Sequence, residues 1–185
     1  MMFDYRLTSI KSQVTQDIWN WIETYIEANN KFYDYKFPVC PFAKKARLDG
    51  VVEVQAWESG SYKQFIKQTA NALIANPEKN ISVIVMPPRA KWTWGIPALI
   101  EKINAESIPQ GYFLQYGTAV QTNSLYPGLF NSNEYFVVMV NQVNPVLDGH
   151  KSLLRTDYYK NWAREHWNNV VVRRQELYEK YQKKS

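Results

Sequence analysis

The chain has 185 residues, 45% of them hydrophobic and 21% charged, which suits a single globular domain over residues 1–185 and excludes general disorder. The net charge of +5 is too thinly spread for a typical nucleic-acid-binding surface, so nucleic acid is not an expected partner. No apolar run is long enough to cross a bilayer and a lone cysteine forms no internal disulfide, so we expect a cytoplasmic protein without a membrane partner.

Hydrophobic periodicity predicts three elements in the first third of the chain. Residues 16–29 have the spacing of a helix with one buried face, and Thr15 is its expected N-cap. Residues 42–49 are predicted as a short helix that ends at Gly50. Residues 51–58 alternate in hydrophobicity and are rich in β-branched side chains, which predicts a strand.

The strongest strand signal is "ISVIVM", residues 81–86, where consecutive apolar side chains indicate a central strand buried on both faces. Further strands are predicted at residues 111–117 and 135–143, and a long terminal helix at residues 157–184. Strands that alternate with helices favour parallel pairing of the first strands. For the last strand, antiparallel pairing is an alternative. The predicted fold class is α/β or α+β, with about four strands in a mixed sheet packed with helices.

The only cysteine, Cys40, lies between two prolines in "KFPVCPFAKKARLDG", residues 36–50. Proline is favoured at the first helical position, so Pro41 predicts that Cys40 caps the following short helix. Thiolates are stabilised at helix N-termini and beside cations, and Lys44 lies about one turn away. We therefore predict Cys40 as a nucleophile or redox centre whose pKa Lys44 lowers. The alternative is a buried cysteine that serves as a small hydrophobic residue.

A catalytic cysteine needs a base, and the chain has two histidines. His166 falls in the predicted terminal helix, where we expect it to pack at the edge of the core. His150 lies close to Asp148, so Cys40, His150 and Asp148 are the one triad with a cysteine nucleophile that the composition permits. Zinc-ligand spacings and glycine-rich phosphate loops do not occur in the sequence, so we expect neither a metal nor a cofactor.

A second candidate site follows the predicted central strand in "PPRAKWTWG", residues 87–95. In open α/β sheets, ligands bind beyond the carboxyl ends of the strands. Cations and flat rings together suit an anionic or aromatic ligand, and this loop supplies Arg89, Lys91, Trp92 and Trp94. The alternative is that the tryptophans cover the end of the sheet while the cations face water.

Two motifs, "VCPFAKKAR" at residues 39–47 and "TNSLYP" at residues 122–127, are similar to motifs of a widespread bacterial family of uncharacterised α/β proteins. The resemblance covers roughly residues 19–130. It implies a pocket near Cys40 and Lys44, lined also by Thr122, Asn123 and Tyr126. The family usually carries a histidine and acidic residues before its tyrosine-proline motif, and "YGTAVQTN" has neither.

These observations lead to two functional hypotheses. The first is a protein with a ligand-binding or active-site pocket around Cys40, with Asn123 and Tyr126 as hydrogen-bonding groups. The second is a non-catalytic module that binds another protein or forms a homo-oligomer through Trp92, Trp94 and the basic terminal helix. The expected partner is thus a small molecule or a protein.

Overall fold

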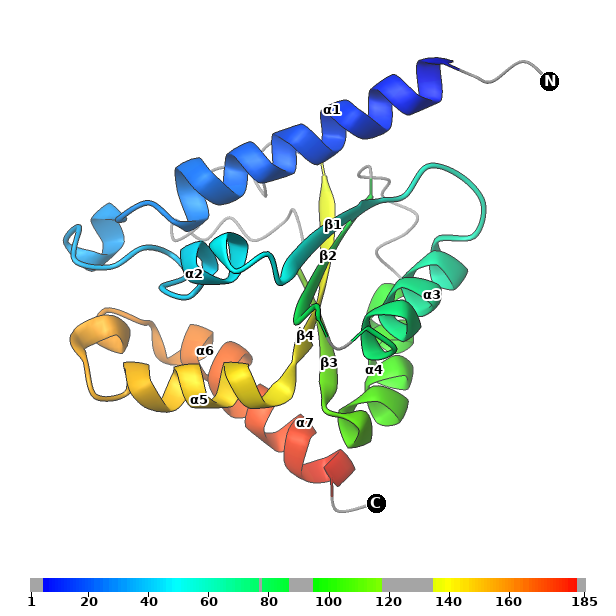
Figure 1. Cartoon of the computed structure of the whole chain (residues 1–185). Helices are drawn as coiled ribbons and strands as arrows, with labels where there is room; N and C mark the ends of the chain where they lie inside the picture. Colours follow the sequence, from blue (N-terminus) through cyan, green and yellow to red (C-terminus); the bar gives the residue numbers. More distant parts are fainter. Residues whose placement is uncertain (1–4, 77, 87–94, 118–134, 183–185) are drawn as a thin grey trace.

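The computed structural model describes residues 5–76, 78–86, 95–117 and 135–182, which form a mixed sheet with helices on both faces (Figure 1). The main helices and strands, in chain order, are α1 (Tyr5–Trp21), α2 (Ala43–Leu48), β1 (Val52–Ala56), α3 (Tyr62–Ile74), β2 (Ile81–Met86), α4 (Ile96–Ser107), β3 (Tyr112–Gly117), β4 (Phe136–Gln142), α5 (Val143–Leu153), α6 (Arg164–Trp167) and α7 (Arg173–Gln182). The shorter turns are η1 (Ile22–Ile26), η2 (Lys31–Tyr33), η3 (Ile108–Gln110), η4 (Asp157–Tyr159) and η5 (Asn168–Val172). The predicted α/β fold class is confirmed.

The strands are ordered β1-β2-β4-β3. β1 and β2 are parallel, and β4 runs antiparallel to both of its neighbours, β2 and β3. β2 is buried from Ser82 to Met86. The prediction of a central strand at residues 81–86 is therefore confirmed, because only a strand with neighbours and helices on both sides buries consecutive side chains.

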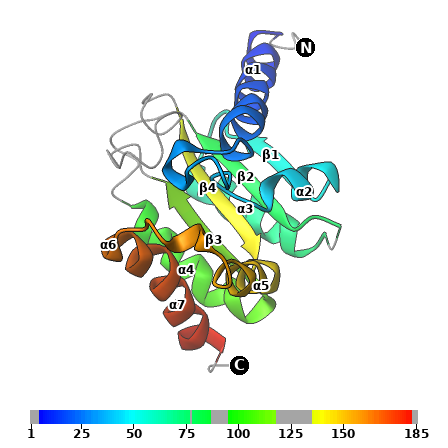
Figure 2. The same ribbon diagram turned by 90° about the vertical axis from the view of Figure 1, so that its left-hand side faces the viewer.

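The two faces of the sheet have different coverings. α3 and α4 pack on one face, with Ile66 of α3 against Ile84 and neighbouring side chains of the sheet. α1 covers part of the other face, with Ile18 against Val85. α5 and α7 cover the rest of that face beside β3 through a smaller core that includes Phe113 (Figures 1 and 2). The fold thus has three layers, with β3 at one edge of the middle layer.

Both terminal helices differ from their predicted bounds. α1 already begins at Tyr5, so Thr15 lies inside the helix and the predicted N-cap is wrong. The predicted C-terminal helix is present but begins at Arg164, because Ala163 has extended backbone angles and separates it from the 3-10 turn η4. π-helical turns continue α1 at η1 and join α6 to α7 at η5.

Within the described ranges, none of the helices has the length and apolar character needed to cross a bilayer.

Candidate functional site

Cys40 lies in the segment that joins η1 to α2. Its N–H donates to the carbonyl oxygen of Ile26 at 3.1 Å, and its own carbonyl accepts from Ala43 at 3.2 Å. The N-cap of α2 is Phe42, so Cys40 precedes the helix and the prediction that it is the cap is wrong. The short turn after Cys40 delays the start of the helix until Ala43.

The surroundings of Cys40 disfavour its thiolate. The residue is half-buried, and burial raises the pKa of its thiol. The backbone amides of Phe42 and Ala43 and the charge of Arg174 act against this rise without reversing it. This direction is opposite to the lowered pKa predicted from the helix terminus. Lys44, which was expected to lower the pKa, is exposed on α2.

His150 lies on α5, where its partner is a tyrosine rather than the predicted carboxylate. Its Nδ1 is 2.9 Å from the hydroxyl oxygen of Tyr159. Burial and the charge of Arg174 lower the pKa of His150, which favours the neutral ring near pH 7. Asp148 is exposed, and its carboxylate lies 3.4 Å from the ammonium group of Lys151. The described contacts therefore do not assemble Asp148 and His150 into a catalytic pair.

A group of rings, here called the aromatic cluster, joins the segment before α2 to the turns after α5. Its members are Tyr33, Phe37, Tyr158, Tyr159 and Trp162. The rings of Tyr33 and Tyr158 stack with their centroids 4.6 Å apart. The Tyr158 hydroxyl donates to the carbonyl oxygen of Val39, next to Cys40. Burial is the main cause that raises the pKa of Tyr159 to about 12, so this hydroxyl stays protonated at neutral pH.

The remaining predicted site residues lie outside the described residues. They are Arg89, Lys91, Trp92 and Trp94 of the loop after β2, and Thr122, Asn123 and Tyr126 of the "TNSLYP" motif. Their roles stay predictions, as does a pocket shared by this motif and Cys40.

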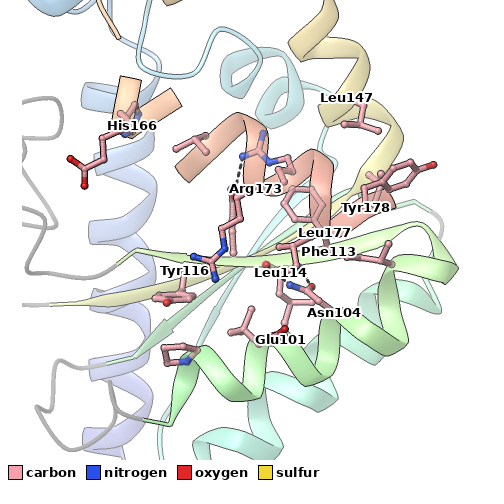
Figure 3. A pocket seen from close by; sticks show the side chains of 18 residues that line it. Glu101, Asn104, Phe113, Leu114, Tyr116, Leu147, His166, Arg173, Leu177 and Tyr178 are labelled. Atoms are coloured by element: carbon pink, nitrogen blue, oxygen red, sulfur yellow. Dashed lines mark hydrogen bonds between the residues drawn. The ribbon is translucent and has the colours of Figure 1, made fainter. Parts of the chain in front are cut away.

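The structure contains a cavity of about 620 Å³ at the edge of the sheet, here called the β3 cavity. Figure 3 shows its three sides: α4 with Glu101 and Asn104, β3 with Phe113, Leu114 and Tyr116, and α7 with Arg173, Leu177 and Tyr178. Apolar side chains from all three sides, including Ile100, Phe113 and Leu177, belong to its lining. A smaller cavity of about 430 Å³ also contains Leu147 and Arg174 in its lining.

Two hydrogen-bonded groups fix polar side chains of the β3 cavity. The amide of Asn104 accepts from the N–H of Leu114 at 2.6 Å and donates to the carbonyl oxygen of Leu114 at 3.0 Å. The guanidinium group of Arg174 donates to the side-chain oxygen of Gln115 at 2.9 Å and lies 5.2 Å from the centre of the Phe113 ring. Arg174 is thus held on two sides, by a polar partner and an aromatic face.

The π-helical turn η5 immediately precedes the arginines of the cavity. Its five residues, "NNVVV", join α6 to α7, and Val170 belongs to the lining. An inserted π-turn rotates everything that follows it by about one residue position relative to a regular helix. η5 therefore helps to determine which side of α7 faces β3. Such turns occur frequently at functional sites.

Sequence reasoning did not single out Asn104 or Arg174, although both carry a detectable signal. Arg174 is four residues after Val170 and three before Leu177, so it stands on the apolar stripe of its helix. Asn104 has the same place in α4, four residues after Ile100. A polar residue on an apolar stripe must find a partner within the fold, and both residues do so at β3.

In the part of the chain that the structure describes, histidine, cysteine, aspartate and glutamate side chains form no group of three or more that could hold a metal ion.

Comparison of the chain with models of known protein families, with curated proteins and with solved structures found no significant match. The similarity of its two motifs to the bacterial α/β family therefore stays a prediction.

Proposed function

We propose that this protein binds a small organic molecule in the β3 cavity. The observation that carries the proposal is the size of the cavity, because about 620 Å³ falls within the roughly 300–1,000 Å³ of typical small-molecule sites. Such sites combine a mostly apolar lining with a few polar groups that orient the ligand. The β3 cavity has apolar residues from α4, β3 and α7 and the fixed guanidinium group of Arg174, although polar atoms make up the larger part of its exposed lining.

Three hypotheses drawn from the sequence stay predictions, and the proposal does not depend on them. Thiol-dependent chemistry at Cys40 is one, and Arg174 relates it to the cavity because the charge of this arginine acts on the thiol. Homo-oligomerisation or protein binding through Trp92, Trp94 and the terminal helix is another. A cytoplasmic location is the third.

An uncharged fluorescent probe tests whether the β3 cavity admits an apolar molecule. N-phenylnaphthylamine fluoresces strongly in apolar sites, so a titration should show saturable binding of one probe per chain. Leu177→Trp places a large ring among the lining residues and should weaken binding about tenfold, because it removes space that the probe occupies. The measurement is the dissociation constant from fluorescence, with circular dichroism to check the fold.

Leu154→Trp is the matched control, because Leu154 is 53% exposed and lies outside the cavity lining. It should leave the dissociation constant unchanged. If Leu177→Trp does not fold, Val170→Phe provides the same steric test from η5. Unsaturable binding, or equal affinity in the cavity variants and the control, would contradict the proposal.

A further inference from the structure

The 3-10 turn η4 joins two parts of the molecule through two neighbouring tyrosines. The ring of Tyr158 stacks on Tyr33, and its hydroxyl donates to the carbonyl oxygen of Val39, next to Cys40. Tyr159 contacts α5 instead, where its hydroxyl oxygen is 2.9 Å from Nδ1 of His150. η4 therefore connects α5 to the segment that contains Cys40, and the pair of Tyr159 and His150 is its polar attachment to α5.

The bond between Tyr159 and His150 depends on the charge of the histidine. The pKa of Tyr159 is raised to about 12, so its hydroxyl keeps its proton, and among the described residues His150 is its hydrogen-bond partner. A neutral imidazole accepts such a bond at Nδ1 when Nε2 carries the ring hydrogen. In the imidazolium form both ring nitrogens are donors, so the Tyr159 hydroxyl loses its acceptor.

α7 carries charged groups that share the smaller cavity with His150. Arg174 is half-buried, and its charge lowers the pKa of His150. Glu176 and Glu179 line the same cavity, but both are exposed, so water screens their attraction for a cation. α6 contributes the uncharged ring of Trp167, whose centroid lies 5.7 Å from that of the imidazole. Within the described part of the chain, only Tyr159 forms a hydrogen bond with the ring of His150.

Burial, more than charge, lowers the pKa of His150. On α5 itself, Asp148 and Lys151 are exposed and lie 3.4 Å apart, so their charges offset each other. Because packing lowers the pKa of the ring, a state in which η4 has left α5 takes up a proton more readily, with an ordinary histidine pKa of about 6.5. Lowering the pH past this value therefore favours the open state.

We propose that His150 and Tyr159 form an acid-sensitive switch. Near neutral pH, their hydrogen bond keeps η4 on α5, and through Tyr158 it keeps the segment of Cys40 closed. When His150 takes up a proton, the Tyr159 hydroxyl loses its acceptor, η4 separates from α5 and the segment of Cys40 opens. The switch regulates access to this part of the molecule and does not depend on a ligand in the β3 cavity.

The reactivity of Cys40 tests the switch in the full chain. Cys40 is the one thiol of the sequence, and dithiodipyridine reacts with thiols below neutral pH as well. The rate in the guanidinium-unfolded chain divided by the rate in the folded protein gives the protection of the thiol. Far below the thiol pKa, the thiolate fraction of both states changes equally with pH, so this ratio isolates opening. Protection should fall at least about threefold between about pH 7 and pH 5.

His150→Asn removes the titrating ring and keeps an acceptor. The side-chain oxygen of asparagine replaces Nδ1 as the partner of Tyr159 and does not titrate, so protection should stay within about twofold over the same pH range. Tyr159→Phe removes the hydroxyl instead and should lower protection about threefold already at neutral pH. It also provides the test if His150→Asn fails to fold.

His166→Asn is the matched control. His166 is the other histidine of the chain; it is buried on α6, and burial lowers its pKa too. It does not contact the Tyr159 hydroxyl, so the fall in protection should persist in this variant.

Constant protection in the wild-type protein would overturn the switch. A fall that persists in His150→Asn, or that disappears in His166→Asn instead, would also overturn it, because acid would then act at another group. Circular dichroism at each pH distinguishes local opening from global unfolding, and loss of helical signal in step with protection would count against the inference. Binding of the neutral probe near pH 7 tests the β3 cavity separately, so either proposal can fail alone.

Discussion

At Cys40, backbone amides and burial act on the same sulfur in opposite directions. The amides of Phe42 and Ala43 favour the thiolate, as the neighbouring helix start led us to expect. Burial disfavours it and is the larger effect, so the pKa of the thiol is raised. The pKa of this thiol therefore depends on the balance between burial and the nearby amides and charge that favour the thiolate.

We expect iodoacetamide to react with Cys40 with a pH midpoint above that of the same cysteine in the guanidinium-unfolded chain. The reason is that burial raises the thiol pKa in the folded state only. The unfolded chain therefore ionises first, and the free energy of unfolding should fall as the pH rises past the unfolded thiol pKa. Rates of alkylation measured against pH in both states check this. A lower midpoint in the folded protein would instead restore the predicted low-pKa thiolate.

At the scale of elements, α4 protects the exposed edge of the sheet. β3 is the last of the described strands in the order β1-β2-β4-β3, so among the described residues alternate backbone groups on its outer side have no neighbouring strand. The Asn104 amide bonds the N–H and the carbonyl of Leu114 much as the peptide of another strand would. This arrangement opposes strand addition at Leu114. It also holds Leu114, which belongs to the lining of the β3 cavity, in place.

Asn104→Ala should lower the free energy of unfolding by about 1–3 kcal/mol, because both backbone groups of buried Leu114 lose their side-chain partner. Urea denaturation followed by circular dichroism measures this change. Asn71→Ala, at an exposed position of α3, is the control and should be neutral or slightly stabilising, since alanine favours helices. Equal stability of the two variants would show that the Asn104 bonds contribute nothing.

At the scale of the whole molecule, the aromatic cluster ties the N-terminal segments to the C-terminal turns. Trp162 donates its ring N–H to the hydroxyl of Tyr33 at 3.1 Å, and Asn161 donates to the carbonyl of Phe32 at 3.1 Å. The bond from Tyr158 to Val39 spans 119 residues of sequence. These contacts hold the segment of Cys40 beside the turns that follow α5.

Tyr158→Phe should lower the free energy of unfolding by about 1–2 kcal/mol, because the buried carbonyl of Val39 loses the hydroxyl that binds it. It should also speed alkylation of Cys40 at a fixed pH, since the neighbouring segment opens more often. Thermal unfolding and alkylation rates are the measurements. Tyr35→Phe is the control, because Tyr35 is 63% exposed. An identical effect of the two variants would contradict a stabilising role for the hydrogen bond from Tyr158 to Val39.

The sequence alone predicted the strands, the short helix after Cys40, the presence of a helix near each end of the chain and the α/β class. This was possible because hydrophobic periodicity depends on which side of an element is buried, and the buried run at residues 81–86 needs no distant contact to be recognised. Boundaries were less well determined: α1 already begins at Tyr5, and Ala163 interrupts the terminal segment, where local signals were weak.

Only the tertiary structure decided what surrounds each chemical group. Arg174 meets Gln115 across 59 residues of sequence, and Tyr158 meets Val39 across 119, so no local pattern specifies these pairs. The direction of the Cys40 pKa and the existence of the β3 cavity depend on such distant neighbours. Burial and cavity shape are properties of packed elements, whereas hydrophobic periodicity is a property of a single element. The fold class was therefore predictable from the sequence, and the β3 cavity was not.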